Sequence, residues 1–288
     1  MKKLILSVLL IPAVFSAQQT VSRDAEIANY VSQVSADSLK SHINKLVSFG
    51  TRHTMSSTTD AKKGIGAARN WVLSKFKNYA KNSDGRMEVF LQSQTIQPDG
   101  KRINQPTDLG NAIAILRGTD PNDKRIFMIG GHLDSRVSDV MNNKDFAPGA
   151  NDDGSGVGAV IESARILSQS KFPATIVFVA FSGEEQGLLG AKMLAEKAKN
   201  ENWQLEALLN NDMIGNNLTS ETNLINANQL RVFSEGLPQF DLDKKAQGIR
   251  NLGLENDGET RQLARYIKEI GERYVDNLEV KLIYRNDR

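Results

Sequence analysis

The sequence contains no cysteine and only three histidines, at His42, His53 and His132. The absence of cysteine excludes disulfides, thiolate zinc sites, iron–sulfur clusters and cysteine nucleophiles. Because histidine is scarce, any metal site in this chain must use mostly carboxylate ligands. Because disulfides are excluded, the stability of the chain must come from packing or from a bound metal.

Neither sign of charge dominates, since 36 lysines and arginines stand against 34 aspartates and glutamates in 288 residues. This balance argues against a nucleic-acid-binding protein, whose affinity depends on a strongly basic face. Hydrophobic residues make up 40% of the chain and charged residues 24%, an ordinary composition for a soluble globular protein. The length allows one large domain or two small ones.

One apolar run of about a dozen residues stands at the N-terminus, where Leu4 to Phe15 follows Lys2 and Lys3. It is too short to span a bilayer, which takes about 20 apolar residues. With small residues behind it, the run indicates a cleaved secretory signal over residues 1–17, the alternative being a buried N-terminal helix. No lipobox cysteine follows, so we expect a secreted or periplasmic protein with no membrane attachment after cleavage.

The remaining chain predicts an α/β protein. Residues 18–50 carry helical spacing and predict two short helices before a main domain over residues 51–288. In that domain we expect helices at 61–79, 155–168, 188–199 and 259–274, strands at 87–96, 111–116, 125–129, 175–181 and 278–284, and an apolar segment at 205–214. Such alternation indicates a mostly parallel mixed sheet flanked by helices.

Four polar clusters follow or face the ends of the predicted strands. They are Gly131-His132-Leu133-Asp134-Ser135, Pro148-Gly149-Ala150-Asn151-Asp152-Asp153-Gly154-Ser155-Gly156, Ser182-Gly183-Glu184-Glu185-Gln186-Gly187 and Asn211-Asp212-Met213-Ile214-Gly215. Each alone has a structural explanation, as a hydrogen-bonded loop pair, a helix N-cap or a solvated first helical turn. Ligand sites in open α/β sheets, however, lie at the carboxyl ends of the strands.

Together the four clusters would bring one imidazole and six carboxylates into one crevice. These are His132, Asp134, Asp152, Asp153, Glu184, Glu185 and Asp212. Adjacent carboxylates at the edge of a core are costly unless a cation or a proton neutralises them. One imidazole among carboxylates suits a pair of divalent ions, with zinc favoured in a site of nitrogen and oxygen ligands. In such pairs one carboxylate is shared by ions about 3.5–4 Å apart.

At these motifs the chain resembles the secreted dizinc aminopeptidases of metallopeptidase family twenty-eight, relatives of bacterial leucyl aminopeptidase and of glutamate carboxypeptidase. The resemblance runs from about Leu39 to the C-terminus and includes the segment Phe49-Gly50-Thr51-Arg52-His53. It implies a zinc-exopeptidase fold of the phosphorylase/hydrolase-like type, zinc as cofactor and peptides as substrates.

The resemblance also implies a metal ligand set. His132 and Asp212 would bind one zinc, Asp152 would bridge both zincs, and Glu185 would bind the second. The family's second zinc takes a further histidine near the C-terminal end of the domain, and no histidine follows His132 here. We therefore expect a single domain that lacks its last elements, with two zincs in the complete enzyme and one or two in this chain.

Catalytic roles follow from the same resemblance. Glu184 would be the general base that acts on a metal-activated water, and Asp134 would hold the second nitrogen of His132. Asp153 would support its loop, and the other two histidines would not be ligands.

The expected activity is that of a zinc-dependent aminopeptidase that hydrolyses N-terminal residues of peptides. The main alternative is an inactive or truncated binding domain with an incomplete metal site. A carboxypeptidase or a glutaminyl cyclase on the same fold is less favoured. The oligomeric state and the preferred side chain stay open.

Overall fold

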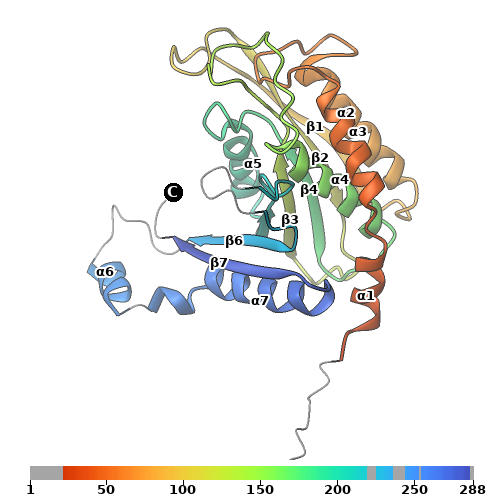
Figure 1. The fold of residues 1–288 in the computed structure, drawn as a ribbon, viewed down its shortest axis with the longest axis vertical. Coiled ribbons are helices and arrows are strands. Elements are labelled where there is room, and N and C mark those ends of the chain that lie inside the picture. Colours follow the sequence, from red (N-terminus) through yellow and green to blue (C-terminus); the bar gives the residue numbers. More distant parts are fainter. Residues whose placement is uncertain (1–21, 219–224, 236–243, 253, 286–288) are drawn as a thin grey trace, which may run out of the picture.

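A five-stranded mixed sheet forms the centre of the computed structural model, which describes residues 22–218, 225–235, 244–252 and 254–285 (Figure 1). Its strands, in spatial order, are β1 (Met87–Ile96), β2 (Thr107–Leu116), β4 (Thr175–Phe181), β3 (Arg125–His132) and β5 (Gln204–Asn210). β2 pairs antiparallel with β1 and β4, and β3 pairs parallel with β4 and β5. The predicted α/β fold with a mixed sheet flanked by helices is confirmed. The predicted signal segment, residues 1–17, lies outside the described residues.

Helices cover both faces of this sheet. α3 (Gly64–Ala80) and α4 (Gly154–Leu167) pack on one face, and α5 (Leu189–Asn200) covers the other (Figure 1). The predicted pair of N-terminal helices forms as α1 (Ala25–Ser32) and α2 (Ala36–Val47), and α2 packs against α4.

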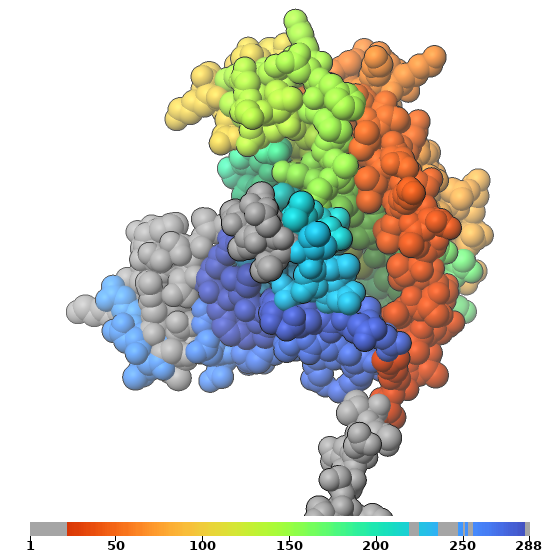
Figure 2. Space-filling model, in the orientation of Figure 1, coloured from red at the N-terminus to blue at the C-terminus, as the bar shows by residue number. Residues whose placement is uncertain are grey.

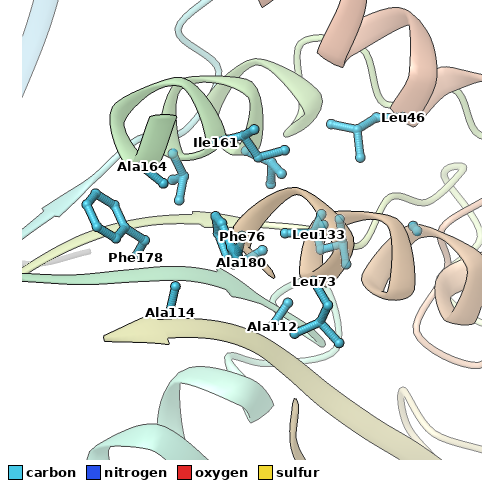
Figure 3. Close-up of a cluster of buried hydrophobic side chains, with 14 of the residues drawn as sticks. Leu46, Leu73, Phe76, Ala112, Ala114, Leu133, Ile161, Ala164, Phe178 and Ala180 are labelled. Atoms are coloured by element: carbon cyan, nitrogen blue, oxygen red, sulfur yellow. The ribbon is translucent and has the colours of Figure 1, made fainter. Parts of the chain in front are cut away.

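The alternation of side chains along β2 and β4 divides the core into two layers. Ala112 and Ala114 of β2 and Phe178 of β4 face α3 and α4, and they belong to the same core cluster as Ile161 of α4 (Figure 3). Ile113, one residue along β2, belongs to the cluster on the α5 side. Both faces of these strands are therefore buried, as their nearly continuous apolar sequence predicts.

A second, two-stranded parallel sheet stands beside the first. It consists of β6 (Gln229–Glu235) and β7 (Glu279–Arg285), and α7 (Glu259–Tyr274) packs on both strands. In the chain, α6 (Lys244–Asn251) and the 3₁₀ helix η1 (Leu254–Asp257) lie between β6 and α7. α7 and β7 were predicted, whereas β6 and α6 were not. The segment before α1 reaches this part, because the main-chain N–H of Asp24 donates to the hydroxyl of Tyr274 at 2.7 Å. None of the described helices has the length and apolar character needed to cross a membrane.

Candidate metal centre

Three neighbouring parallel strands end at the same edge of the central sheet. In the register of the sheet, His132 at the end of β3 lies opposite Phe181 at the end of β4. On its other side, Gly130 of β3 lies opposite Asn210, the last residue of β5. The polar segments that follow β3, β4 and β5 therefore start side by side, as the sequence predicts.

His132 lies at the centre of a three-residue cluster. Its Nε2 is 2.9 Å from Oδ1 of Asp152 and 4.0 Å from Oδ1 of Asp212. One potential ligand atom from each of the three residues lies within 4.8 Å of the others. The imidazole is 4% exposed, whereas the side chains of Asp152 and Asp212 are 47% and 22% exposed. The cluster is therefore closed behind the histidine and open to solvent on the side of the carboxylates.

The distances and charges in this cluster fit a zinc ion. Tetrahedral zinc with ligands at about 2.1 Å places neighbouring ligand atoms about 3.4 Å apart. The two distances from His132 Nε2 lie on either side of this value. Burial by itself would lower the pKa of His132, but hydrogen bonds with Asp134 and Asp152 and the charges of Asp134 and Asp153 raise it to about 12. The same negative charge would favour a cation bound to a neutral imidazole in place of that proton.

Two glycines of the motifs allow the main chain to approach this closely. A Cβ on Gly131 would lie 2.9 Å from the main-chain carbon of Gly156 and 3.0 Å from a carboxylate oxygen of Asp153. A Cβ on Gly156 would overlap the main-chain oxygen of Asn211. Glycine at both positions thus brings the end of β3, the start of α4 and the segment after β5 into direct contact.

The buried carboxylate of Asp153 joins three of the four motifs. Its oxygens accept from the main-chain N–H groups of His132 at 2.9 Å, Gly156 at 2.9 Å and Met213 at 3.3 Å. Burial raises the pKa of Asp153 to about 7, against the opposing effects of the His132 charge and of the N–H groups of Gly156 and His132. Asp153 also caps α4 and forms a cis peptide bond with Asp152. Its contacts are those of a residue that organises the loop.

We predict that Asp153→Asn destabilises the protein without removing its zinc. The side-chain NH₂ of asparagine would then face a main-chain N–H that now donates to a carboxylate oxygen, so that N–H would lose its acceptor. An unsatisfied buried donor costs about 1–3 kcal/mol. Chemical denaturation of the metal-free protein measures this loss, and elemental analysis of the zinc-saturated variant measures the metal. A variant of unchanged stability that had lost zinc would instead identify Asp153 as a ligand.

Asp134 fixes the main chain of the two adjacent glutamates. Its carboxylate is fully buried and accepts from the N–H of Glu184 and the N–H of Glu185, each at 3.1 Å, and from the Thr54 hydroxyl at 3.2 Å. Burial by itself would raise the pKa of Asp134, but the hydrogen bond and charge of His132 and the two N–H groups lower it. Nδ1 of His132 lies 3.1 Å from the main-chain oxygen of Asp134 and 3.7 Å from its carboxylate.

The two glutamates differ in their surroundings. Glu184 is half-buried, and burial raises its pKa, with neighbouring carboxylates adding to the effect. Glu185 accepts through Oε2 from Nε of Arg136 at 2.6 Å. That hydrogen bond raises the pKa of Arg136, and the negative charges of Glu185, Asp152 and Glu184 raise it further.

The other two histidines lie outside the ligand cluster. His53 is fully buried, with Nε2 3.0 Å from the main-chain oxygen of Val140 and Nδ1 accepting from the N–H of Met55. His42 is buried on α2, where its ring packs edge-on against Trp71 with centroids 5.9 Å apart.

Four polar residues beside the cluster had no predicted role, namely Arg52, Thr54, Arg136 and Gln186. The Thr54 hydroxyl hydrogen-bonds both the carboxylate of Asp134 and the side-chain oxygen of Gln186. Their positions within or next to the quoted motifs were the one available signal, because nothing in the local pattern shows which way such side chains point.

Comparison with known proteins agrees with the motifs. Residues 111–238 match the model of peptidase family M28. The chain carries a domain of that family. All four polar motifs lie within the matched range of the M28 domain, and the resemblance predicted from them is confirmed. A protein of Pyricularia oryzae described as a probable zinc metalloprotease is 41% identical over 266 residues, which make up 92% of this chain and 52% of that protein. The chain thus spans about half the length of this curated relative.

Solved structures share the fold of the M28 domain. The LapA aminopeptidase of Legionella pneumophila matches with a TM-score of 0.60 and 20% identity, over 98% of this chain and 62% of its own. A glutaminyl cyclase of Bacteroides thetaiotaomicron, bound to N-acetylhistamine, matches with a TM-score of 0.55 and 17% identity, over 86% of this chain and 77% of its own. At these identities the likeness establishes a common fold.

Proposed function

We propose that the M28 domain is the catalytic part of a zinc-dependent aminopeptidase, which removes N-terminal residues from peptides. The observation that carries this proposal is the convergence of His132, Asp152 and Asp212 at the edge where three parallel strands end. The description of the fungal relative as a zinc metalloprotease supports the choice of metal, and the fold shared with LapA aminopeptidase supports the type of reaction.

The proposed ligands divide between two zinc ions in the complete enzyme. His132 and Asp212 would hold the first ion, and Asp152 would be shared between both. Glu185 would hold the second through Oε1, since its Oε2 accepts from Arg136. A set of one nitrogen and several carboxylate oxygens is a common zinc environment in proteins.

The residues around the metal ligands supply the proton transfers. Zinc bound there would act as a Lewis acid on the scissile carbonyl and lower the pKa of a coordinated water from about 15.7 towards about 7. Glu184 would take a proton from the attacking water and then deliver it to the leaving amine. Burial raises the pKa of Glu184, and a raised pKa suits a carboxyl group that must both accept and donate a proton. Asp134 would hold Glu184 and His132 in position through the contacts described above.

We place this activity outside the cytoplasm. The proposal rests on the basic and apolar pattern of residues 1–17, which is typical of a secretory signal. Peptides in the periplasm or the surroundings of the cell would then be the substrates.

Zinc content and substrate choice together test the proposal. We expect the purified full chain to bind zinc and to hydrolyse aminoacyl p-nitroanilides, with no activity on N-acetylated anilides or after chelation. Elemental analysis and absorbance assays measure both. Bound zinc without turnover of any peptide substrate would favour a non-catalytic binding domain, cleavage at the C-terminus would favour a carboxypeptidase, and a chain that binds no zinc would refute the metallopeptidase.

A glutaminyl cyclase is a second candidate. Within the described ranges the candidate ligands form one group of three, which suits a single zinc, and a glutaminyl cyclase shares the fold. Release of ammonia from a peptide with N-terminal glutamine, without peptide hydrolysis, would identify this activity in the same preparation.

A further inference from the structure

A fully buried arginine lies behind the proposed metal ligands. Arg52 is 1% exposed and follows α2 in a short segment that runs beside the loop between β3 and α4. The adjacent Thr51 forms a bridge with Ala147 of that loop, and the N–H of Ala147 donates to the oxygen of Gly50 at 2.9 Å. In Figure 2 the same loop, in yellow-green, lies against the orange N-terminal segment.

The guanidinium of Arg52 donates to main-chain oxygens at both ends of the loop between β3 and α4, each end close in sequence to a proposed ligand. Nε donates to Leu133, the residue after His132, at 2.7 Å. Nη1 and Nη2 donate to Pro148 at 2.8 Å and to Gly149 at 2.9 Å, three to four residues before Asp152.

Two further contacts complete the position of this residue. Nη1 also lies 3.3 Å from the main-chain oxygen of Leu46 in α2. The main-chain N–H of Arg52 donates to the Ser135 hydroxyl at 3.1 Å, and that hydroxyl donates to the oxygen of Ala147 at 2.8 Å. Arg52 and Ser135 therefore connect the segment after β3 with the segment before α4 at several points.

A charge buried in this way is costly unless its surroundings compensate for it. The hydrogen-bond acceptors of Arg52 are neutral carbonyls, and the compensating negative charges belong to Asp134, Asp153 and Asp152. Burial lowers the pKa of Arg52 to about 10 against the effect of these carboxylates, so the side chain stays charged at neutral pH. The planar guanidinium directs its N–H groups in fixed directions, which a lysine ammonium does not do.

We propose that Arg52 is a positioning residue of the metal centre, which holds the two ends of the loop between β3 and α4 at the separation at which His132 and Asp152 can bind one zinc. This inference rests on the zinc site of the proposed function. Nε2 of His132 and Oδ1 of Asp152 are 2.9 Å apart, and each belongs to a segment whose main chain Arg52 contacts. An ammonium group at position 52 keeps the positive charge but cannot reach the oxygens of Leu133, Pro148 and Gly149 together.

Arg52→Lys, compared with Arg69→Lys, tests the role. Arg69 is a matched control because it is also buried, at 5% exposure, and its hydrogen-bond partners are the main-chain and carboxylate oxygens of Asp108 in β2. We expect Arg52→Lys to weaken zinc binding about 10–100-fold, the range found when groups that orient metal ligands are removed. Arg69→Lys should lower the melting temperature and leave the zinc affinity at the wild-type value.

The measurements are made on the full chain without substrate. Competition with a chromogenic chelator gives the Kd for zinc, and the visible absorption of the cobalt-substituted protein reports the ligand geometry, which we expect to change in Arg52→Lys alone. Ser135→Ala is the milder variant if Arg52→Lys does not fold, and it should weaken zinc binding in the same direction.

The outcomes separate this inference from the proposed function. Equal zinc affinities and cobalt spectra in Arg52→Lys and the wild type would overturn the positioning role while leaving the zinc site in place. An equal loss of affinity in Arg69→Lys would also overturn it, since the effect would then be one of general stability. A wild-type chain that binds no zinc would refute the proposed function itself.

Discussion

Glu184→Gln is expected to lower kcat about 10²–10⁴-fold in the zinc-loaded protein, the range that a positioned general base contributes. Glutamine keeps the size of the side chain and removes its ability to accept a proton. The carboxylate of Asp134 accepts a hydrogen bond from the main-chain N–H of Glu184, and a change of the side chain at position 184 leaves that contact in place. Zinc content and KM should therefore stay near their wild-type values. Steady-state kinetics with an aminoacyl anilide and elemental analysis measure all three quantities.

Glu196→Gln provides the control for this experiment. Glu196 is exposed on α5, so the same chemical change there should leave kcat unaltered. Wild-type turnover in Glu184→Gln would mean that another group takes the proton. Loss of zinc in Glu184→Gln would mean that this glutamate is a ligand, and that the roles of Glu184 and Glu185 are exchanged.

Asp152→Asn should remove the metal and with it all turnover. Asp152 is the proposed shared ligand, and its Oδ1 is the carboxylate oxygen nearest to His132 Nε2 in the cluster. A ligand that binds the folded state alone stabilises it by about 2.7 kcal/mol at a concentration 100 times its Kd. The wild type should show such a gain on addition of zinc and Asp152→Asn should show none. Chemical denaturation with and without zinc measures the difference.

Asp145→Asn is the matched control, because Asp145 is an exposed carboxylate in the same loop and its side chain accepts from Asn142. It should keep the zinc-dependent gain in stability. If Asp152→Asn retained both zinc and the gain, the metal centre would have to lie elsewhere and the proposed ligand set would be wrong.

Long, regular patterns located their elements accurately from the sequence. The strands Met87–Ile96 and Thr175–Phe181 and the helix Glu259–Tyr274 have the predicted bounds. The antiparallel pairing of β2 with both neighbours was not predicted, because the choice of partner strand depends on tertiary contacts that a local pattern does not contain. β6 was missed because its apolar residues do not mark one buried face, since Phe233 is 47% exposed and the polar residue Ser234 is buried beside it.

The same difference between local patterns and tertiary contacts decides which parts of the site were predictable. The meeting of His132 and Asp212 was predictable because parallel neighbours carry their carboxyl ends to one edge. The place of Arg52 was not predictable, since its partners at Leu133, Pro148 and Gly149 are main-chain oxygens, which every residue possesses. No residue type in the sequence marks such an acceptor.

The close contact of Gly131 and Gly156 limits how this centre can diverge. No side chain can be added there without displacing main chain, whereas the carboxylate of Asp152 is 47% exposed to solvent. In the proposed peptidase, a substrate would therefore approach past the exposed carboxylates. Among relatives with different preferences, we expect the strand ends to change little and the segments bordering the exposed carboxylates to carry most of the variation.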